Sequence, residues 1–269
     1  MFTIFKEHRG FGKQILMLAK DDLIKTYKGS VLGPIWALMK PLFQLFVYWF
    51  AFAVGIRGGA DRVEMGAPFF IFLMVGFIPW FFISDAINRG SKSIRQNKQF
   101  VTKVSFPVSV IMTYTTLSKF FIHLVLMALG YIYLMFAGYM PSVYNLQFFL
   151  YAPFMFIFFL VLLWSLAPMS AFSKDFENLI TTIMAGLFWL SGVVYNSYEL
   201  EYEWLRKLLL FNPITYFVNG YRKTFICDQW FFEGPYPIEN IIILVEFVAI
   251  IFLGIFNYNR LRRRLPDVL

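Results

Sequence analysis

Apolar residues gather in long runs along the chain, and the short segments between them carry most of the charge. A membrane-spanning helix needs about 20 mostly apolar residues. The runs that reach this length are residues 34–56, 68–87, 107–137, 147–171, 178–195 and 238–259. The pattern predicts an all-α polytopic membrane protein with six transmembrane helices.

The basic residues predict which side of the membrane each connecting segment faces. An even number of spans places both termini on one side. If that side is the cytoplasm, the inner segments hold sixteen Lys and Arg residues and the outer segments hold six. Cytoplasmic loops carry such an excess of positive charge, so we expect both termini in the cytoplasm. The inner segments are 1–31, 88–105, 172–177 and 260–269, and the outer ones are 57–67, 138–146 and 196–237.

Composition supports the membrane assignment. Of the 269 residues, 59% are hydrophobic and only 15% are charged, whereas a soluble domain carries about a quarter charged residues. The opening MFTIFKEHRGFGKQ lacks the apolar core of a signal peptide, so we expect no cleavage there. The single cysteine, Cys227, excludes an internal disulfide. The net charge of +8 is interpreted as asymmetry across the membrane rather than as nucleic-acid binding.

Residues 1–31 are predicted to be a cytoplasmic segment, followed by a six-span membrane domain over 32–269. Within the first segment, residues 11–28 place apolar side chains mostly on one helical face and lysines largely on the other. Such a helix lies in the membrane interface or packs on the protein's own cytoplasmic surface, and the two are not exclusive. We expect the interfacial form.

Two connecting segments are predicted to do more than turn the chain. Residues 91–100, inside the cytoplasmic loop 88–105, contain no Gly or Pro and can form a short helix that docks into a cytoplasmic subunit. The alternative is a loop whose charges only set the topology. The outer segment 196–237 contains LLLFNPITYFVNGY, too short and broken to cross. Exposing backbone polar groups to lipid is costly, which favours re-entrant or interfacial half-helices joined near Asn212-Pro213 over an extracellular cap without function.

Charged residues inside the spans are expected to face a cavity or a partner, because charge in a bilayer is costly. Lys40, near the cytoplasmic end of the first span, faces a cavity or snorkels to the interface. Asp85 is expected to pair with a loop arginine. Lys119 and His123 lie one helical turn apart in the third span, with Glu246 as their expected counter-charge. A structural pairing is favoured here over a proton relay.

The sequence contains no motif for bond chemistry. A phosphate-binding glycine loop, an H-E-x-x-H metal motif and the glycines of a nucleophile elbow are all absent. We therefore expect no catalytic residue and no metal site. A membrane-embedded transferase would need a carboxylate or a histidine–acid pair at the membrane surface. An ion-coupled carrier would show inverted repeats, and no clear repeat relates the first three spans to the last three.

Several motifs, taken in order, resemble those of one family. IKTYKGSVLGPIWALMKPLFQLFVYWFAFAVGIR is followed by GSKSI, FPVSVIMTYTTLSKFFIHL, KDFENL and NPITYFVNGYRKTF. This order resembles the permeases of polysaccharide-export ABC transporters over essentially the whole chain. VYWFAFAVGIR and FPVSVIMTYTTLSKFFIHL are most similar to wall teichoic acid translocation permeases, with O-antigen and capsule exporters as close cousins. Lys174-Asp175 departs from the more usual Arg-Asp pair.

The resemblance implies a homodimeric permease of the cytoplasmic membrane that works with two copies of a separate ABC ATPase. ATP and Mg would be bound by that subunit, and this chain would hold no cofactor. The substrate would be an undecaprenyl-diphosphate-linked polymer, with wall teichoic acid favoured. O-antigen or capsular polysaccharide is the alternative, and a drug substrate is less favoured. Membrane lipids are expected partners and nucleic acids are not.

The resemblance and the chemistry of the side chains together predict four groups of site residues. Cations suit a diphosphate, and we expect the lipid head group at Lys25, Lys28, Lys40 and Arg89. Aromatic faces stack on sugar rings, although much of the aromatic content must contact lipid. The expected polymer path is Trp36, Phe43, Trp49, Trp80, Phe81, Phe188, Trp189 and Tyr195. Coupling to the ATPase is expected at Arg89, Ser91, Lys92, Ile94 and Arg95. The expected extracellular gate is Asn212, Pro213, Tyr216, Tyr221 and Arg222.

Overall fold

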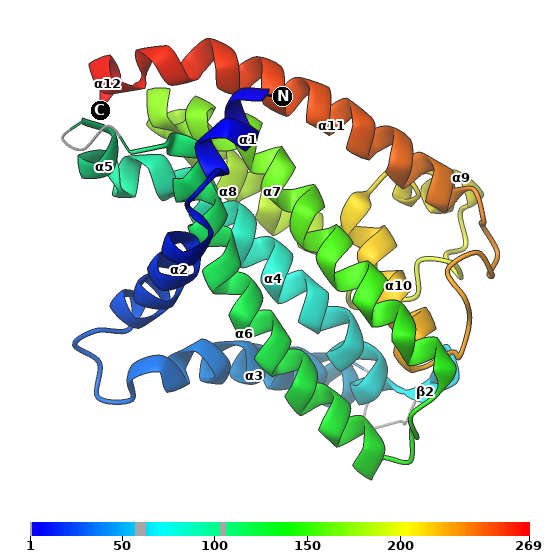
Figure 1. Ribbon diagram of the computed structural model, residues 1–269. Coiled ribbons are helices and arrows are strands. Elements are labelled where there is room, and N and C mark those ends of the chain that lie inside the picture. The colour runs from blue at the N-terminus through cyan, green and yellow to red at the C-terminus, as the bar shows by residue number, and fades with distance from the viewer. Residues whose placement is uncertain (1, 57–62, 103–105) are drawn as a thin grey trace.

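The computed structural model describes residues 2–56, 63–102 and 106–269, and this part of the chain is mostly helical (Figure 1). Its α-helices are α1 (Phe2–His8), α2 (Gly12–Thr26), α3 (Trp36–Trp49), α4 (Phe69–Gln96), α5 (Lys98–Thr102), α6 (Val108–Phe136), α7 (Phe148–Phe172), α8 (Lys174–Trp189), α9 (Glu203–Leu209), α10 (Pro213–Phe225), α11 (Glu239–Leu261) and α12 (Leu265–Val268). Shorter elements are the 3-10 turns η1 (Gly33–Ile35), η3 (Val143–Gln147) and η4 (Arg262–Arg264), the π-helix η2 (Phe50–Ile56) and the antiparallel strands β1 (Val63–Glu64) and β2 (Ala67–Pro68).

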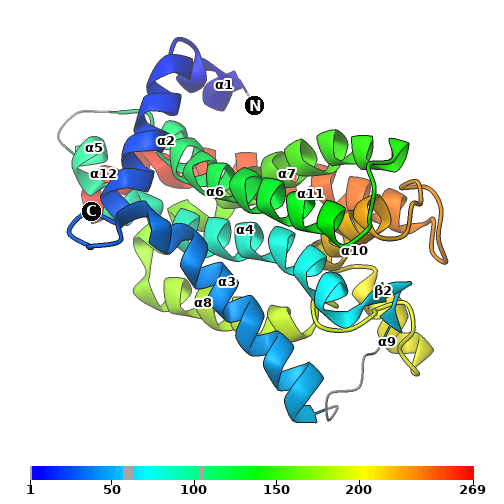
Figure 2. The same ribbon diagram turned by 90° about the horizontal axis from the view of Figure 1, so that it is seen from below.

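Helix α4 is the central element of the fold. It packs against α6, α7, α10, α8 and α3, and Figure 1 shows it between α6 and α7, with α11 beyond α7. Figure 2 shows α3 and α8 on its other side. In its most apolar window 78% of residues are buried, against 11% for the first span and 17% for the last. The peripheral helices therefore present apolar faces to the surroundings, as a bilayer requires.

Five helical segments of the described chain are long and apolar enough to cross a membrane. They are Gly33–Gly55, Phe69–Gln96, Val108–Phe136, Val143–Phe172 and Glu239–Val268. These segments confirm the predicted first, second, third, fourth and last apolar runs as long helices. The chain is thus a multi-pass membrane protein.

The remaining predicted span, 178–195, coincides only in part with a helix. Helix α8 has 16 residues and ends at Trp189, a length of about 24 Å against the roughly 30 Å of a hydrocarbon core. The chain then leaves helical geometry, and Gly192 adopts a φ of +67°, which L side chains rarely adopt. Its carbonyl accepts a hydrogen bond from the buried Arg222. After Trp189 the chain therefore follows the turn at Gly192 and the bond to Arg222, and it does not continue the predicted helix.

The inner end of the second span also differs from the prediction. Residues 88–96 are the last turns of α4 rather than part of a loop, and no separate helix covers 91–100. The helix continues because small and apolar side chains of these turns stay buried, and Gly90 lies directly against Leu163 of α7. The chain breaks only at Asn97, after which the short α5 follows.

The amphipathic N-terminal segment forms α2, which packs along α6. Ile15 and Ala19 are buried in this contact, and the Asp22 carboxylate accepts a hydrogen bond of 2.7 Å from the hydroxyl of Ser118. Leu16 and Met17 remain more than half exposed. Packing on the protein's own surface is therefore observed, and the outward apolar side chains leave insertion into the interface as a prediction.

Both termini lie at the end of the molecule that also carries α5 (Figure 1, Figure 2). A carboxylate of α1 holds them together. Glu7 accepts hydrogen bonds from Arg262 at 2.5 Å, from the Tyr258 hydroxyl at 2.5 Å and from the Ser109 hydroxyl at 2.6 Å. One partly buried acidic side chain thus joins the first helix to α6 and α11.

The packing of α7 on α11 generates a stability prediction. A Cβ added at Gly254 would lie 2.9 Å from the backbone carbonyl oxygen of Val161, and backbone cannot move aside cheaply. Gly254→Ala should cost about 1–3 kcal/mol through overpacking and lower the apparent melting temperature in detergent. Gly186→Ala in α8 is the matched control, because nothing lies within 4 Å of its added Cβ and alanine favours a helix. An equal response of both variants would contradict this account of the contact.

Candidate functional site

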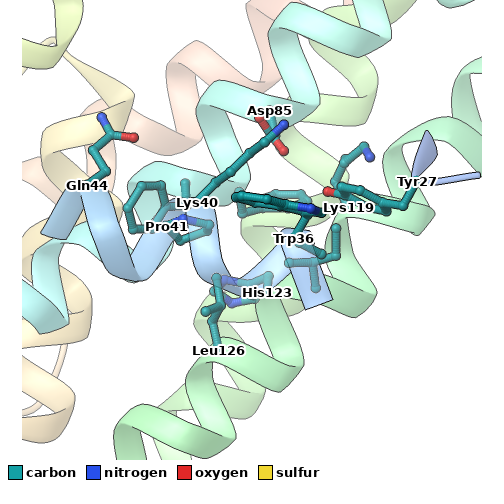
Figure 3. Close-up of a pocket in the computed structure, with 13 residues that line it drawn as sticks. Tyr27, Trp36, Lys40, Pro41, Gln44, Asp85, Lys119, His123 and Leu126 are labelled. Atoms are coloured by element: carbon teal, nitrogen blue, oxygen red, sulfur yellow. The ribbon is translucent and has the colours of Figure 1, made fainter. Parts of the chain in front are cut away.

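A polar cavity of about 180 Å³ opens where α3, α4 and α6 meet the chain that follows α2 (Figure 3). Helix α3 supplies Trp36, Lys40, Pro41 and Gln44, α4 supplies Asp85, and α6 supplies Lys119 and His123. Helices α3, α4 and α6 are otherwise apolar spans. A charged cavity among them marks the candidate site, since charged groups in membrane spans generally face functional cavities.

Lys40 and Asp85 stand at the open side of this cavity. Both side chains are exposed, and Figure 3 shows Lys40 extending toward the carboxyl group of Asp85. One turn further along α4, Arg89 donates a hydrogen bond of 3.0 Å to the Thr26 hydroxyl at the end of α2. Of the four predicted head-group residues, Lys40 therefore lines the cavity, and Arg89 lies one turn beyond the lining residue Asp85 without lining it.

The other two predicted head-group residues lie elsewhere. Lys25 and Lys28 are exposed on the last turn of α2 and just after it, and neither lines the cavity. Tyr27, between them in sequence, does line it.

Lys119 is the most deeply placed cation of the site. Its residue is only 1% exposed, and its ammonium nitrogen has no hydrogen-bond partner among the residues that the structure describes. Charged side chains near it include Arg89, Asp85, Asp22 and Lys40. The sequence identified Lys119 as an intramembrane charge but did not place it in the site.

The expected pairing around Lys119 is wrong. The His123 ring, one turn along α6, bonds the Tyr221 hydroxyl at 2.8 Å and approaches the Ile78 carbonyl at 3.4 Å. Its polar contacts are therefore with α10 and α4. Glu246 lies on α11, which packs against α7, and it is not among the charges acting on Lys119. The hydrophobic pattern could not show that α11 packs mainly along α7 rather than beside Lys119.

The predicted polymer-path aromatics divide into three groups. Trp36 and Phe81 line the cavity. Trp80, Phe188 and Trp189 pack together, with ring centroids of Trp80 and Phe188 5.3 Å apart and those of Phe188 and Trp189 5.1 Å apart. The remaining three are placed separately: Phe43 is 67% exposed on α3, Trp49 packs edge-on against Phe70, and the Tyr195 hydroxyl bonds the Trp189 carbonyl.

The predicted gate residues lie on α10 or at its first turn, at the end of the molecule opposite to the one that carries α5 (Figure 1). Asn212 caps this helix, accepting a hydrogen bond of 3.0 Å from the Ile214 amide, and Pro213 occupies its first turn. Short helices α9 and α10 do flank this dipeptide, as predicted, while their entry into the membrane remains a prediction. Tyr216 donates to Asn240 at 3.0 Å.

Arg222 is fully buried, although the sequence placed it in an outer loop. Its guanidinium donates to the carbonyls of Gly192 and Val193 at 2.6 Å each. It also stacks on the Phe72 ring, 3.5 Å from the centroid. Gly76 of α4 leaves the space that this guanidinium occupies. The arginine thus joins α10, α4 and the chain after α8 through charge-assisted hydrogen bonds.

A second buried cation lies beside it. Lys223, 1% exposed, forms an ion pair with Glu239 at the start of α11 and donates to the Glu233 carbonyl at 2.8 Å. The Tyr198 hydroxyl donates to the same carboxylate at 2.8 Å. Burial and the neighbouring Glu239 carboxylate raise the pKa of Tyr198 well above its usual value, so it remains a donor at neutral pH.

The predicted coupling residues occupy the C-terminal end of α4. Ser91 and Ile94 are buried, while Lys92 and Arg95 approach Glu177 of α8 at 3.6 and 3.7 Å. Arg95 also donates to the backbone carbonyls of Ser170 and Ala171. The exposed residues at this end are those of α5 and its approach: Gln96, Lys98, Gln99 and Thr102.

Comparison with known proteins defines the class. The model of the ABC-2 type transporter membrane family matches residues 13–226, and the chain therefore belongs to the ABC-2 type transporter family. The described residues contain no group of three metal-ligating side chains.

Particular relatives are exporter permeases. The chain is 27% identical over 230 residues to the O-antigen export system permease protein RfbA of Myxococcus xanthus, covering 84% of this chain and 85% of the relative. It is 23% identical over 262 residues to a protein of the same name from Klebsiella pneumoniae, covering 95% and 94%.

The Lys223–Glu239 pair generates a second stability prediction. Glu239→Gln keeps the side-chain size but leaves a buried ammonium without its counter-charge, which costs about 3–5 kcal/mol. We expect a clear fall in the apparent melting temperature at neutral pH. Glu203→Gln breaks the exposed ion pair with Lys207, 2.8 Å long, and should leave the melting temperature unchanged, because solvent screens that pair. Similar shifts for both variants would contradict the structural role of the buried pair.

Proposed function

We propose that this chain is the membrane subunit of an ATP-driven exporter that moves a lipid-linked surface polysaccharide across the cytoplasmic membrane. The observation that carries the proposal is the family match, which spans the cavity and its charged residues. The relatives support the substrate class, because their names assign them to O-antigen export. No observation favours a drug exporter or a transferase.

The proposed identity of the polymer rests more on the names of the relatives than on the sequence motifs. The sequence motifs favour wall teichoic acid, whereas both relatives described above are named for O-antigen export. We therefore propose a lipid-linked polysaccharide of the O-antigen kind and keep teichoic acid as the second candidate. Both polymers would be carried on a lipid diphosphate, so the same cavity chemistry serves either.

The proposed assembly is a homodimer with two ABC ATPase subunits, which bind ATP and Mg. In this assembly α8 and the residues after it form the sixth crossing, and α9 and α10 are re-entrant helices at the outer face. The ATPase would contact the end of the molecule that carries α5. Exposure of Lys98 and Gln99 at this end supports the assignment.

Transport would begin with the head group at the cavity. Lys40 and Arg89 are cations on two different helices near one opening, which suits the spread charge of a diphosphate. Closure of the ATPase would move α5 and the end of α4, and α4 contacts every helix that lines the cavity. The sugar chain would then pass along aromatic faces toward α10.

Association with an ATPase tests the proposal directly. The tagged chain is expressed with a candidate ABC ATPase from the same genome and purified in detergent. We expect a stable complex whose ATP hydrolysis responds to the chain. A chain that never associates with an ATPase would contradict the proposed function.

The contact through α5 generates a separate prediction. Lys98→Glu should reduce ATPase association or polymer export by about tenfold, because like-charge placement at an interface costs more than the original contact gains. Lys98 has no internal ion pair among the described residues, so the fold should be unaffected. Lys207→Glu, at the opposite end, is the control and should leave both readouts unchanged. Full association and export by Lys98→Glu would exclude α5 as the contact.

A further inference from the structure

Lys119 combines three features that together point to a ligand. Its side chain is 99% buried by area, at 1% residual exposure, and it lines the cavity. Its ammonium has no hydrogen-bond acceptor among the described residues. A buried charge without acceptors is strongly unfavourable, and protein groups normally satisfy it. The buried cations Arg222 and Lys223 of this chain are satisfied in this way, because backbone carbonyls and a carboxylate accept their hydrogen bonds.

The surroundings of Lys119 favour an anion rather than a cation. Lys40 and Arg89 add positive charge, while Asp85 and Asp22 are the acidic groups that act on it. Of these carboxylates, Asp22 is engaged by the Ser118 hydroxyl at 2.7 Å. Asp85 is exposed and is approached by Lys40 (Figure 3). The basic side chains outnumber the acidic ones, so an entering oxyanion would meet net positive charge.

The cavity also offers room. Its volume is about 180 Å³, and a water molecule takes about 30 Å³ in the liquid. A small oxyanion can therefore enter with some of its water. Entry from the open side would bring it first to Lys40 and then to Lys119.

We propose that Lys119 is the buried anchor of an oxyanion-binding site in this cavity, and that the site takes a phosphate oxygen of a diphosphate. The identity of the anion as the head group of the exported lipid rests on the proposed function. The site itself rests on the unsatisfied ammonium and the cavity. Asp85 would compete with the anion for these cations, and an arriving anion would take its place beside Lys40.

The alternative is that Lys119 and Asp85 only stabilise each other. The two roles predict opposite effects of removing the carboxylate. A competing Asp85 weakens anion binding, so Asp85→Asn should strengthen it. A structural partner that positions Lys119 would give weaker binding once removed.

The experiment measures equilibrium binding to the purified full chain in lipid nanodiscs. One arm uses inorganic pyrophosphate and the other uses undecaprenyl diphosphate supplied in the nanodisc. Lys119→Met should weaken binding at least tenfold, the usual loss for a hydrogen bond to a charged group. Lys119→Arg should retain binding, and Asp85→Asn should tighten it about fivefold. Lys207→Met, on the exposed α9, should bind as the unaltered chain does.

The two arms identify the source of the phosphate. Lys119-dependent binding of both probes supports a site for the diphosphate alone, and binding of the lipid only supports a head group held together with its tail. Unchanged binding by Lys119→Met, weaker binding by Asp85→Asn, or binding of neither probe would overturn the site. Melting curves of each variant separate a lost site from a lost fold.

The outcome is independent of the proposed function. If the complex exports lipid-linked polysaccharide but Lys119→Met binds and exports normally, the site is overturned and the function stands. If Lys119 binds pyrophosphate but the complex moves no polysaccharide lipid, the function is overturned and the site stands.

Discussion

The structure depends on one constraint: groups that hydrocarbon cannot solvate must be satisfied inside the protein. Helix α4 meets this constraint because other helices of the protein surround it. Among the described residues it is the most buried of the long apolar helices, and α3, α6, α7, α8 and α10 pack against it. Small residues such as Gly76 and Gly90 allow this closeness, because Arg222 and Leu163 occupy the space that a side chain would need. The rest of the molecule is arranged around this helix.

The same constraint explains where charge is tolerated. At the end that carries the termini, Glu7 collects donors from α6 and α11. At the other end, Arg222 donates hydrogen bonds to backbone carbonyls, and Lys223 forms an ion pair with Glu239. These two networks fix the ends of the bundle. Between them lies the cavity of Lys40, Asp85 and Lys119, whose charges are less completely paired, and a transporter needs such a place to receive a charged substrate.

Helix packing also suggests how motion reaches the cavity. The C-terminal end of α4 is held to α7 and α8 through Arg95 and Glu177, and α5 follows directly. A force applied to α5 would therefore act on a helix that runs past the cavity to the Arg222 network. Because α4 is a single helix over Phe69–Gln96, it links the start of α5 to the cavity without a loop between them.

The sequence predicted the apolar helices well and the placement of charges poorly. The predicted span 107–137 matches α6 within a residue or two, because hydropathy decides where a long helix crosses. Hydropathy could not predict that α4 continues to Gln96, because the polar residues at the end of this helix have the sequence pattern of a loop, and only packing against α7 buries them. Arg222 was expected in an outer gate and is instead buried. Tertiary contacts, which hydropathy does not contain, decide whether a charged residue faces water or a carbonyl.

The candidate site was predicted in part for the same reason. Lys40 and Arg89 were identified from their charge and position, and the structure places them near one cavity. Lys119 was noticed, but its expected partner Glu246 lies on a helix that packs elsewhere. The sequence carried the signal, a charge within an apolar run. Assigning its neighbours required the order in which the helices pack.

Reconstituted transport tests the central claim most directly. The chain and its ATPase are placed in proteoliposomes that contain a fluorescent lipid-linked polysaccharide, and the label's accessibility to an enzyme acting on one leaflet is followed over time. The account predicts ATP-dependent movement of the polymer from the leaflet facing the ATPase to the other leaflet. Movement that proceeds without ATP, or its absence in an assembled and ATP-hydrolysing complex, would contradict it.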